Sequence, residues 1–208
     1  MGLLEKIFSN NKKPEGFLGK LMVGSMNKSL APLADWGFSH IAMKGDETAL
    51  DCGCGGGANV KRMLEMAPRG RVYGLDYSEV SVTKSTKLNK PYIIEGRCEI
   101  AKGDVSNPPY ADDTFDLVTA FETVHYWKEP EKCFARIHRL LKDGGRFLIV
   151  NEGDGTQEKT LKWTKIIKGM TVYTGEELER MLKNAGFGTV TVDRDEENDR
   201  LTVLAVKD

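Results

Sequence analysis

The chain has 208 residues, with 30 Lys and Arg against 31 Asp and Glu and a formal net charge of −1. This length is typical of one domain. The charge balance argues against nucleic-acid binding, for which a basic surface supplies most of the affinity. No stretch has the roughly 20 apolar residues of a membrane span, and the first residues lack the apolar core of a secretory signal. We therefore expect a cytoplasmic monomer or homodimer with a small-molecule partner and neither a nucleic-acid nor a membrane partner.

The four cysteines show neither a disulfide framework nor a zinc-site spacing. Cys52 and Cys54 are one residue apart in a glycine loop, but no nearby His or Cys would complete a tetrahedral metal site. Small apolar side chains in a tight turn explain this pair better. We expect free thiols, as in a reducing compartment, and no metal.

Residues 1–45 carry no clear strand, and apolar residues recur at helical spacing at 17–22 and 30–34. This pattern predicts one or two short amphipathic helices as an N-terminal extension. From residue 46 to 208 the sequence alternates strands and helices in one domain.

The predicted strands are apolar runs bounded by turn residues, at residues 47–53, 71–76, 98–104, 115–121, 145–153, 189–195 and 200–208. The predicted helices carry apolar stripes and capping residues, at residues 58–67, 78–88, 130–144 and 174–185. Strands separated by helices indicate a parallel sheet. The last two strands are too close for a crossover helix and should pair antiparallel. The fold class is α/β, with a Rossmann-like, seven-stranded, mostly parallel sheet, an antiparallel C-terminal hairpin and helices on both faces.

A glycine loop lies directly between the first strand and the first helix of this domain, in the run LDCGCGGGAN at residues 50–59. Such a loop lets the backbone approach a ligand closely. Gly53, Gly55 and Ala58 also satisfy the G-x-G-x-x-A form of the dinucleotide fingerprint. The glycines alone therefore leave the ligand open.

Asp51, two residues before the first glycine, favours one class of ligand. A carboxylate beside a dinucleotide would repel its pyrophosphate. A ligand with an ammonium and a sulfonium, such as S-adenosylmethionine, is attracted by the same carboxylate. Asp51 therefore favours a methyl donor over NAD(P).

This run resembles motif I of the class I S-adenosylmethionine-dependent methyltransferases, D/E-x-G-x-G-x-G, at Asp51, Gly53, Gly55 and Gly57. FDLVTAF (115–121) and LLKDGGRFLIV (140–150) resemble later segments of that family. The resemblance covers residues 46–208 and is greatest to the branch that contains ubiquinone and menaquinone methyltransferases. It implies S-adenosyl-L-methionine as cofactor, and an N-terminal segment that acts as a lid.

The resemblance also assigns roles to the strand ends. Asp76 resembles the acid that binds both ribose hydroxyls, and Gly103-Asp104-Val105 resembles the segment that contacts adenine. Tyr77 is expected over the adenine face, with burial in the core as the alternative. For each acid the alternative is a turn former or a helix cap. The expected cofactor contacts are Asp51, Cys52, Gly53, Gly55, Asp76, Tyr77, Gly103, Asp104, Val105 and Phe121.

Asn107-Pro108-Pro109-Tyr110 spells N-P-P-Y, which resembles the motif of amino-methyltransferases that act on DNA or protein. In those families the motif follows the fourth strand, and here it precedes that strand. We interpret it as a rigid turn.

The loop after the strand at 115–121 should carry the reactive end, because open α/β sheets bind ligands outside the carboxyl ends of their strands. His125 is the candidate general base, since its reference pKa is near neutrality, and a capping or hydrogen-bonded role is the alternative. Glu122 is the second candidate, for a cationic acceptor or for a surface ion pair.

These observations predict methyl transfer to a small-molecule O, N or C acceptor. Two alternatives remain open at this point. One is a nicotinamide-dependent oxidoreductase that uses the same glycine loop. The other is a regulatory module that binds S-adenosylmethionine and transfers nothing.

Overall fold

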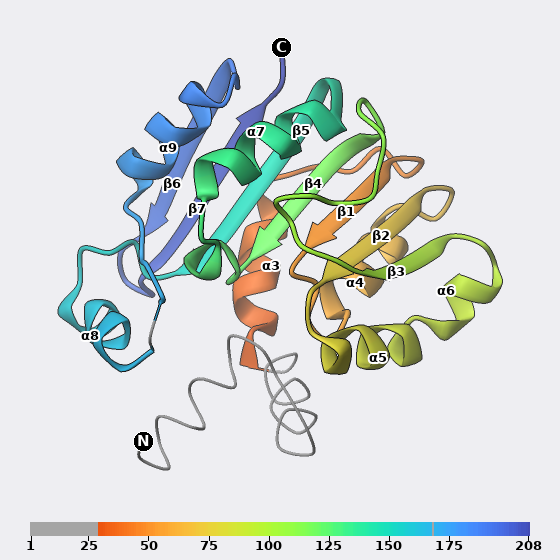
Figure 1. The fold of residues 1–208 in the computed structure, drawn as a ribbon, viewed down its shortest axis with the longest axis horizontal. Helices are drawn as coiled ribbons and strands as arrows, with labels where there is room; N and C mark the ends of the chain where they lie inside the picture. The colour runs from red at the N-terminus through yellow and green to blue at the C-terminus, as the bar shows by residue number, and fades with distance from the viewer. Residues whose placement is uncertain (1–28, 168) are drawn as a thin grey trace.

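A computed structural model describes residues 29–167 and 169–208 of the chain (Figure 1). Within this part, seven strands form one sheet in the order β3-β2-β1-β4-β5-β7-β6. β7 runs antiparallel to both of its neighbours, β5 and β6, and the other pairs are parallel. The predicted sheet and its antiparallel C-terminal hairpin are confirmed. The strands are β1 (Thr48–Cys52), β2 (Arg71–Asp76), β3 (Cys98–Lys102), β4 (Phe115–Phe121), β5 (Leu141–Glu152), β6 (Thr189–Asp195) and β7 (Arg200–Val206).

Helices cover both faces of the sheet. Figure 1 shows α7 and α9 in front of it and α3 and α4 behind it. The described helices are α3 (Ala31–Ser39), α4 (Ala58–Met66), α5 (Glu79–Leu88), α6 (Lys90–Ile94), α7 (Pro130–Leu140), α8 (Glu158–Ile166) and α9 (Gly175–Asn184), with a 3₁₀ turn η1 (Val124–Tyr126). None of them is long and apolar enough to cross a membrane. The apolar repeat at 17–22 lies outside the described residues.

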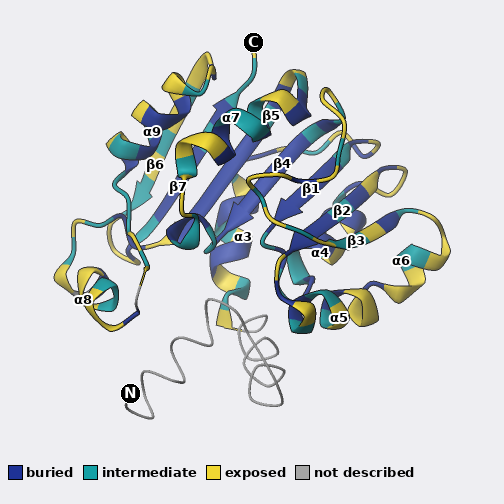
Figure 2. Ribbon diagram, in the orientation of Figure 1, coloured by how far each residue is buried: buried dark blue, intermediate teal, exposed yellow. Residues whose placement is uncertain are grey.

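β4 lies at the centre of the sheet and is buried on both faces, which explains its nearly continuous apolar sequence. Side chains of one face join a core with α7 and α9, in which Phe134 and Phe147 are fully buried. Those of the other face join α3 and α4, around Leu33 and Met63. Figure 2 shows the strands as the most buried part of the molecule.

Local sequence signals set several helix starts as predicted. Thr174 and Glu177 form the reciprocal capping box of α9, with Glu177 N–H donating to Thr174 Oγ1 at 3.2 Å. Ser78 caps α5, where its hydroxyl accepts from the Ser81 N–H. The strand β2 ends at Asp76, two residues before this cap, so the cap helps to fix the end of β2 in place.

One boundary and two helices differ from the sequence prediction. Helix α7 ends at Leu140 rather than at the glycines, because Leu141 is extended (ψ 142°) and pairs with Phe115 of β4. Its apolar side chain continues the helical stripe in sequence but is buried as part of β5. The segment at 154–172, predicted to be a polar connection, contains α8. Helix α6 follows α5, and no hydrophobic periodicity in the sequence indicated it.

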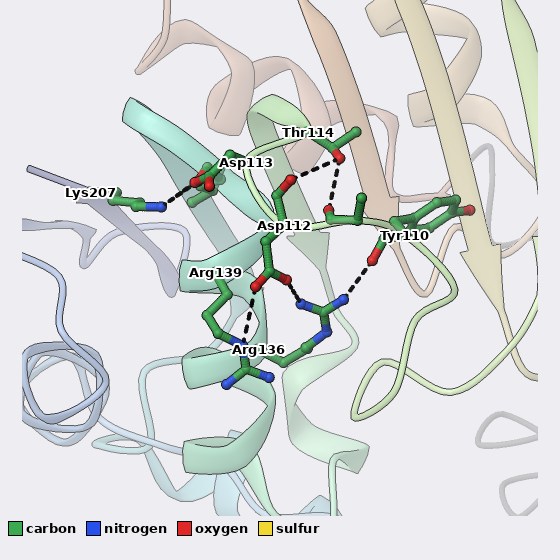
Figure 3. Close-up of polar contacts among 9 residues, drawn as sticks. Tyr110, Asp112, Asp113, Thr114, Arg136, Arg139 and Lys207 are labelled. Atoms are coloured by element: carbon green, nitrogen blue, oxygen red, sulfur yellow. Dashed lines mark hydrogen bonds and ion pairs between the residues drawn. The ribbon is translucent and has the colours of Figure 1, made fainter.

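The loop that precedes β4 is tied to α7 and to the chain end after β7 (Figure 3). Arg136 of α7 binds the carboxylate of Asp112 and donates to the Tyr110 carbonyl at 2.6 Å. Lys207 donates to Asp113 at 2.7 Å. The N-P-P-Y motif ends at Tyr110, so these contacts give it a structural role before β4, as the turn interpretation predicts.

Helix α3 packs closely on the sheet through Gly37. A Cβ at this position would lie 2.6 Å from Val150 Cγ2 and 2.9 Å from Phe121 Cε1. The next residue, Phe38, packs on Phe121 with ring centroids 4.9 Å apart. This contact holds α3 against the ends of β4 and β5.

Gly37→Ala should therefore lower the free energy of unfolding by about 1–2 kcal/mol. Overpacking costs about 1–3 kcal/mol and outweighs the helix propensity of Ala, worth about 1 kcal/mol. Urea unfolding followed by circular dichroism measures the difference. The control Asp35→Ala, on the exposed side of the same helix, should change stability by less than about 0.5 kcal/mol. A Gly37→Ala protein as stable as the wild type would contradict the close packing.

Candidate functional site

A cavity of about 510 Å³ lies at the carboxyl edge of the parallel strands. Its walls come from the ends of β1, β2 and β4, from the loops after β1, β3 and β4, and from the start of α3. This is the edge at which open α/β sheets bind ligands. Its size is typical of a small-molecule site, for which volumes of about 300–1,000 Å³ are common.

The glycine loop after β1 forms one wall, and its backbone requires glycine. Gly53 has φ +77°, and a Cβ there would lie 2.2 Å from Thr123 Oγ1 of the loop after β4. Gly57 has φ +79° and starts α4, where a Cβ would lie 2.3 Å from Ser85 Oγ of α5. Glycine thus lets this loop pack between two neighbouring segments while it faces the cavity.

Asp76, at the end of β2, holds the glycine loop with its carboxylate. Its Oδ2 accepts the Gly55 N–H at 2.9 Å, and its Oδ1 accepts the Ser78 N–H at 2.8 Å. The side chain is 7% exposed and lines the cavity. Burial raises the pKa of Asp76, and the two backbone hydrogen bonds oppose that rise.

Asp51, at β1, is the most desolvated acid of the cavity wall. It is 2% exposed, and its Oδ1 accepts the Thr119 hydroxyl of β4 at 2.7 Å. Burial raises the pKa of Asp51 to about 7, the Thr119 hydrogen bond lowers it, and the nearby charge of Asp76 raises it further. A positive charge in the cavity would favour the ionised form of this carboxyl.

The end of β3 contributes Gly103, Asp104 and Val105 to the cavity, as predicted. Asp104 Oδ1 accepts the N–H and the hydroxyl of Ser106, both at 2.8 Å, so this carboxylate also forms the turn. Tyr77 lines the cavity and is partly exposed.

Of the predicted contacts Phe121 and Cys52, the first lines the cavity and the second is buried in the core. Phe121 lines the cavity, as expected. Cys52 is fully buried in the apolar core and is not among the described lining residues, because the side chains of Asp51 and Cys52 point to opposite faces of β1. Cys54 lines the cavity in its place, and burial raises the pKa of its thiol, so it is not a nucleophile.

The cavity wall also includes residues that no sequence pattern had indicated. The first turn of α3 brings Leu30 and Leu33 to the cavity, and α7 brings Cys133. These positions look like ordinary apolar stripe residues in the sequence. Their place at the cavity depends on contacts between distant segments, so no local pattern could have identified them.

The loop after β4 carries the two candidate catalytic residues, and the structure separates them. Glu122, Thr123, Tyr126 and Trp127 line the cavity. His125 does not belong to the described lining residues, and it is 1% exposed. Glu122 has φ +53°, a conformation that costs a non-glycine residue on the order of 1 kcal/mol.

The charges of the described cavity wall are mainly negative near the glycine loop. Its cationic side chains are Arg62, which is paired with Asp35, and Lys128, which lies on the loop before α7. Neither residue belongs to the glycine loop itself. The acids Asp51 and Asp76 flank that loop, so the site suits a positively charged ligand better than a pyrophosphate.

Comparison with known proteins agrees with this geometry. A family model described as a methyltransferase domain matches residues 50–149. Cycloartenol-C-24-methyltransferase 1 of Oryza sativa subsp. japonica is 31% identical over 53% of this chain and 32% of that protein. Demethylmenaquinone methyltransferase of Lactobacillus johnsonii is 26% identical over 57% of this chain and 49% of its own length. The chain thus matches a third to a half of these two relatives.

A solved structure extends the agreement to the whole fold. It is a complex between the Haloferax volcanii Trm112 methyltransferase activator and a putative methyltransferase. The match has a TM-score of 0.80 and covers 99% of this chain and 98% of that chain, at 18% identity. The matched methyltransferase-domain model, the relatives, the sheet order and the acid-flanked glycine loop all agree with the resemblance of this chain to the class I S-adenosylmethionine-dependent methyltransferases.

Proposed function

We propose that the chain transfers the methyl group of S-adenosylmethionine to a small-molecule acceptor. The observation that carries this proposal is the pair of desolvated carboxylates, Asp51 and Asp76, on either side of a glycine loop that has no cationic side chain. The sulfonium cofactor supplies an activated methyl group. A nicotinamide cofactor would bring a pyrophosphate to the glycine loop beside Asp51, which makes the oxidoreductase alternative unfavourable.

We propose a polar or apolar partner among the described residues for each part of that cofactor. Asp76 is proposed to bind the ribose hydroxyls, and Gly103, Asp104 and Val105 to contact the adenine beside Tyr77. Asp51 is proposed to attract the ammonium end. Gly53, Gly55 and Phe121 complete the wall along which the methionine part would lie.

Methyl transfer to an acceptor is an in-line displacement, so the protein must mainly align the acceptor and exclude water. The start of α3 lines the cavity with Leu30 and Leu33, opposite the strand ends. We propose that residues 1–45 act as an N-terminal lid over the domain at 46–208, with α3 as its described part. Tyr126 and Trp127 close the wall that follows β4.

The acceptor is proposed to have an apolar body. Leu30, Leu33, Phe121 and Trp127 supply apolar wall, and Glu122 supplies one polar group at the end of β4. Two relatives are named for cycloartenol and for demethylmenaquinone, and an acceptor of that general apolar kind fits this wall. The near-neutral charge of the chain argues against a nucleic-acid acceptor.

A base role for Glu122 or His125 stays a prediction. Glu122 reaches the cavity, but its carboxylate already accepts the Glu152 N–H. The imidazole of His125 lies between Glu122 and the Thr171 carbonyl and makes no described contact with the cavity. Acceptors that need no deprotonation are therefore compatible with the site.

Asp76→Ala should weaken the binding of S-adenosylhomocysteine about 10- to 100-fold. The change removes charge-assisted hydrogen bonds worth about 1.5–3 kcal/mol and releases Gly55. Isothermal titration calorimetry measures the affinity. Asp143→Ala, at an exposed position near the start of β5, is the control and should bind within about twofold of the wild type. Binding by Asp76→Ala as tight as by the wild type would contradict the role of Asp76, and no binding by the wild type would end the proposed function.

Protonation of Asp51 should weaken the binding of S-adenosylmethionine about tenfold as the pH falls from 8 to 6. Because burial raises the pKa of Asp51 to about 7, its carboxyl is mostly protonated at pH 6 and loses its attraction for a cation. Calorimetry with wild type and Asp51→Asn gives the ratio of their dissociation constants, in which the cofactor's own titration cancels. A ratio that stays constant between pH 6 and pH 8 would show that Asp51 does not titrate against the ligand.

The raised pKa of Asp51 affects the stability of the ligand-free protein in the opposite direction: stability falls as the pH rises. Burial of the Asp51 carboxylate is unfavourable above its folded pKa, and this cost is absent below the unfolded value of 3.8. Asp51→Asn should therefore raise the melting temperature at pH 8, and the gain should shrink as the pH falls toward 4. Calorimetric melting without ligand measures it. A variant that is less stable than the wild type at pH 8 would contradict the desolvation of Asp51.

A further inference from the structure

Glu122 is held by the end of β5 from two directions. Its own N–H donates to the Val150 carbonyl at 2.9 Å, and its Oε1 accepts the Glu152 N–H. Its backbone lies in the left-handed region, with φ +53°. A non-glycine residue keeps this conformation where the surroundings impose it. The loop after β4 is therefore anchored to β5 at Glu122.

His125 joins the same loop to a segment far along the chain. Its Nε2 lies 3.5 Å from Glu122 Oε1, and its Nδ1 lies 3.3 Å from the carbonyl oxygen of Thr171. The Thr171 N–H donates back to the His125 carbonyl at 2.9 Å. Main chain and imidazole thus connect η1 to the residues that follow α8.

The segment that carries α8 has left-handed glycines on both sides. Gly153 and Gly155 precede the helix with φ +80° and +77°, and Gly169 follows it with φ +78°. Leu161 and Ile166 of α8 are each 40% exposed. Figure 1 shows α8 beyond the carboxyl edge of the sheet, away from the helices on its two faces.

The two ends of this segment have different attachments. At its start, Thr160 donates to Asp199 Oδ2 at 2.7 Å, in the turn between β6 and β7. At its end, Thr171 is bound by His125. The second attachment is adjacent to the cavity wall, because Tyr126 and Trp127 follow His125 directly and line the cavity.

The wall connects further to the glycine loop. Trp127 Nε1 donates to Thr123 Oγ1 at 3.3 Å, and the same hydroxyl lies 2.2 Å from the position that a Cβ of Gly53 would have. A ligand that reduces the motion of the glycine loop would therefore also reduce the motion of Thr123, which packs against that loop, and of η1. Because His125, in η1, follows Thr123 and contacts Thr171, it can transmit this reduced motion to Thr171.

We propose that His125 is a positioning residue, whose Nδ1 contact with the Thr171 carbonyl couples the α8 segment to occupancy of the cavity. The identity of the cavity ligand rests on the proposed function, but the contact itself does not. Nδ1, rather than Nε2, carries the coupling. A base, in contrast, would have to present a ring nitrogen to the acceptor in the cavity.

Asn and Gln distinguish the two ring nitrogens. The side-chain amide of Asn can replace a donor at the position of Nδ1, and that of the longer Gln a donor at the position of Nε2. The experiment compares wild type, His125→Asn and His125→Gln in the full chain. Hydrogen–deuterium exchange and mass spectrometry follow peptides that cover residues 158–173, with and without saturating S-adenosylhomocysteine. His138→Asn, on α7, is the matched control.

The proposal predicts that S-adenosylhomocysteine slows exchange in these peptides at least threefold in the wild type and in His125→Asn, because coupling between two sites is reciprocal. His125→Gln should exchange about tenfold faster without ligand and lose the slowing, while its affinity for S-adenosylhomocysteine stays within about threefold. His138→Asn should behave as the wild type. Gly169→Ala strains the backbone before Thr171 with His125 intact, and should also exchange faster; it replaces His125→Gln if that variant does not fold.

Equal exchange in His125→Asn and His125→Gln would overturn the assignment to Nδ1. If S-adenosylhomocysteine leaves the exchange of the wild type unchanged, although calorimetry shows that the protein is saturated, the proposed coupling is wrong. A wild type that binds no S-adenosylhomocysteine would contradict the proposed function instead, and the ligand-free difference between the Asn and Gln variants would still decide whether His125 holds Thr171.

Discussion

Desolvation of two carboxylates at one edge of the sheet determines which ligands the cavity can hold. Asp76 binds the backbone of the glycine loop and of the α5 start with both oxygens. Asp51 has a single described hydrogen bond, from the Thr119 hydroxyl, and burial raises its pKa to about 7. An ionised carboxyl in such surroundings is unfavourable until a positive charge lies near it. The ligand-free site is therefore prepared for a cation.

The rest of the fold brings these acids together and encloses them. Parallel pairing of β1 with β2 places Asp51 beside Gly74, two residues before Asp76. β4 supplies Thr119 from the other side of β1. Helix α3 packs on Phe121 and lines the cavity with Leu33 and Ala34. The sheet thus fixes the charges, and the N-terminal helix supplies the apolar wall that reduces their contact with water.

Local patterns were sufficient for the parts of the site that lie at strand ends. Asp51 and Asp76 could be predicted because a strand, a glycine loop and a helix follow one another within a short stretch. The enclosure of His125 could not, because its partner Thr171 is 46 residues away and belongs to a segment without clear periodicity. Leu141 fits a helical stripe in sequence, yet strand pairing with Phe115 places it in β5. Contacts between distant segments decided these positions.

The central claim concerns the ionisation of Asp51, and a carbon-13 NMR titration of its carboxyl measures that directly. Asp51→Asn identifies the resonance. The account predicts a pKa near 7 in the ligand-free protein and a decrease of at least two units when S-adenosylmethionine is bound, because the cation favours the carboxylate. A ligand-free pKa near the ordinary value of about 4, or a pKa that S-adenosylmethionine leaves unchanged, would contradict it.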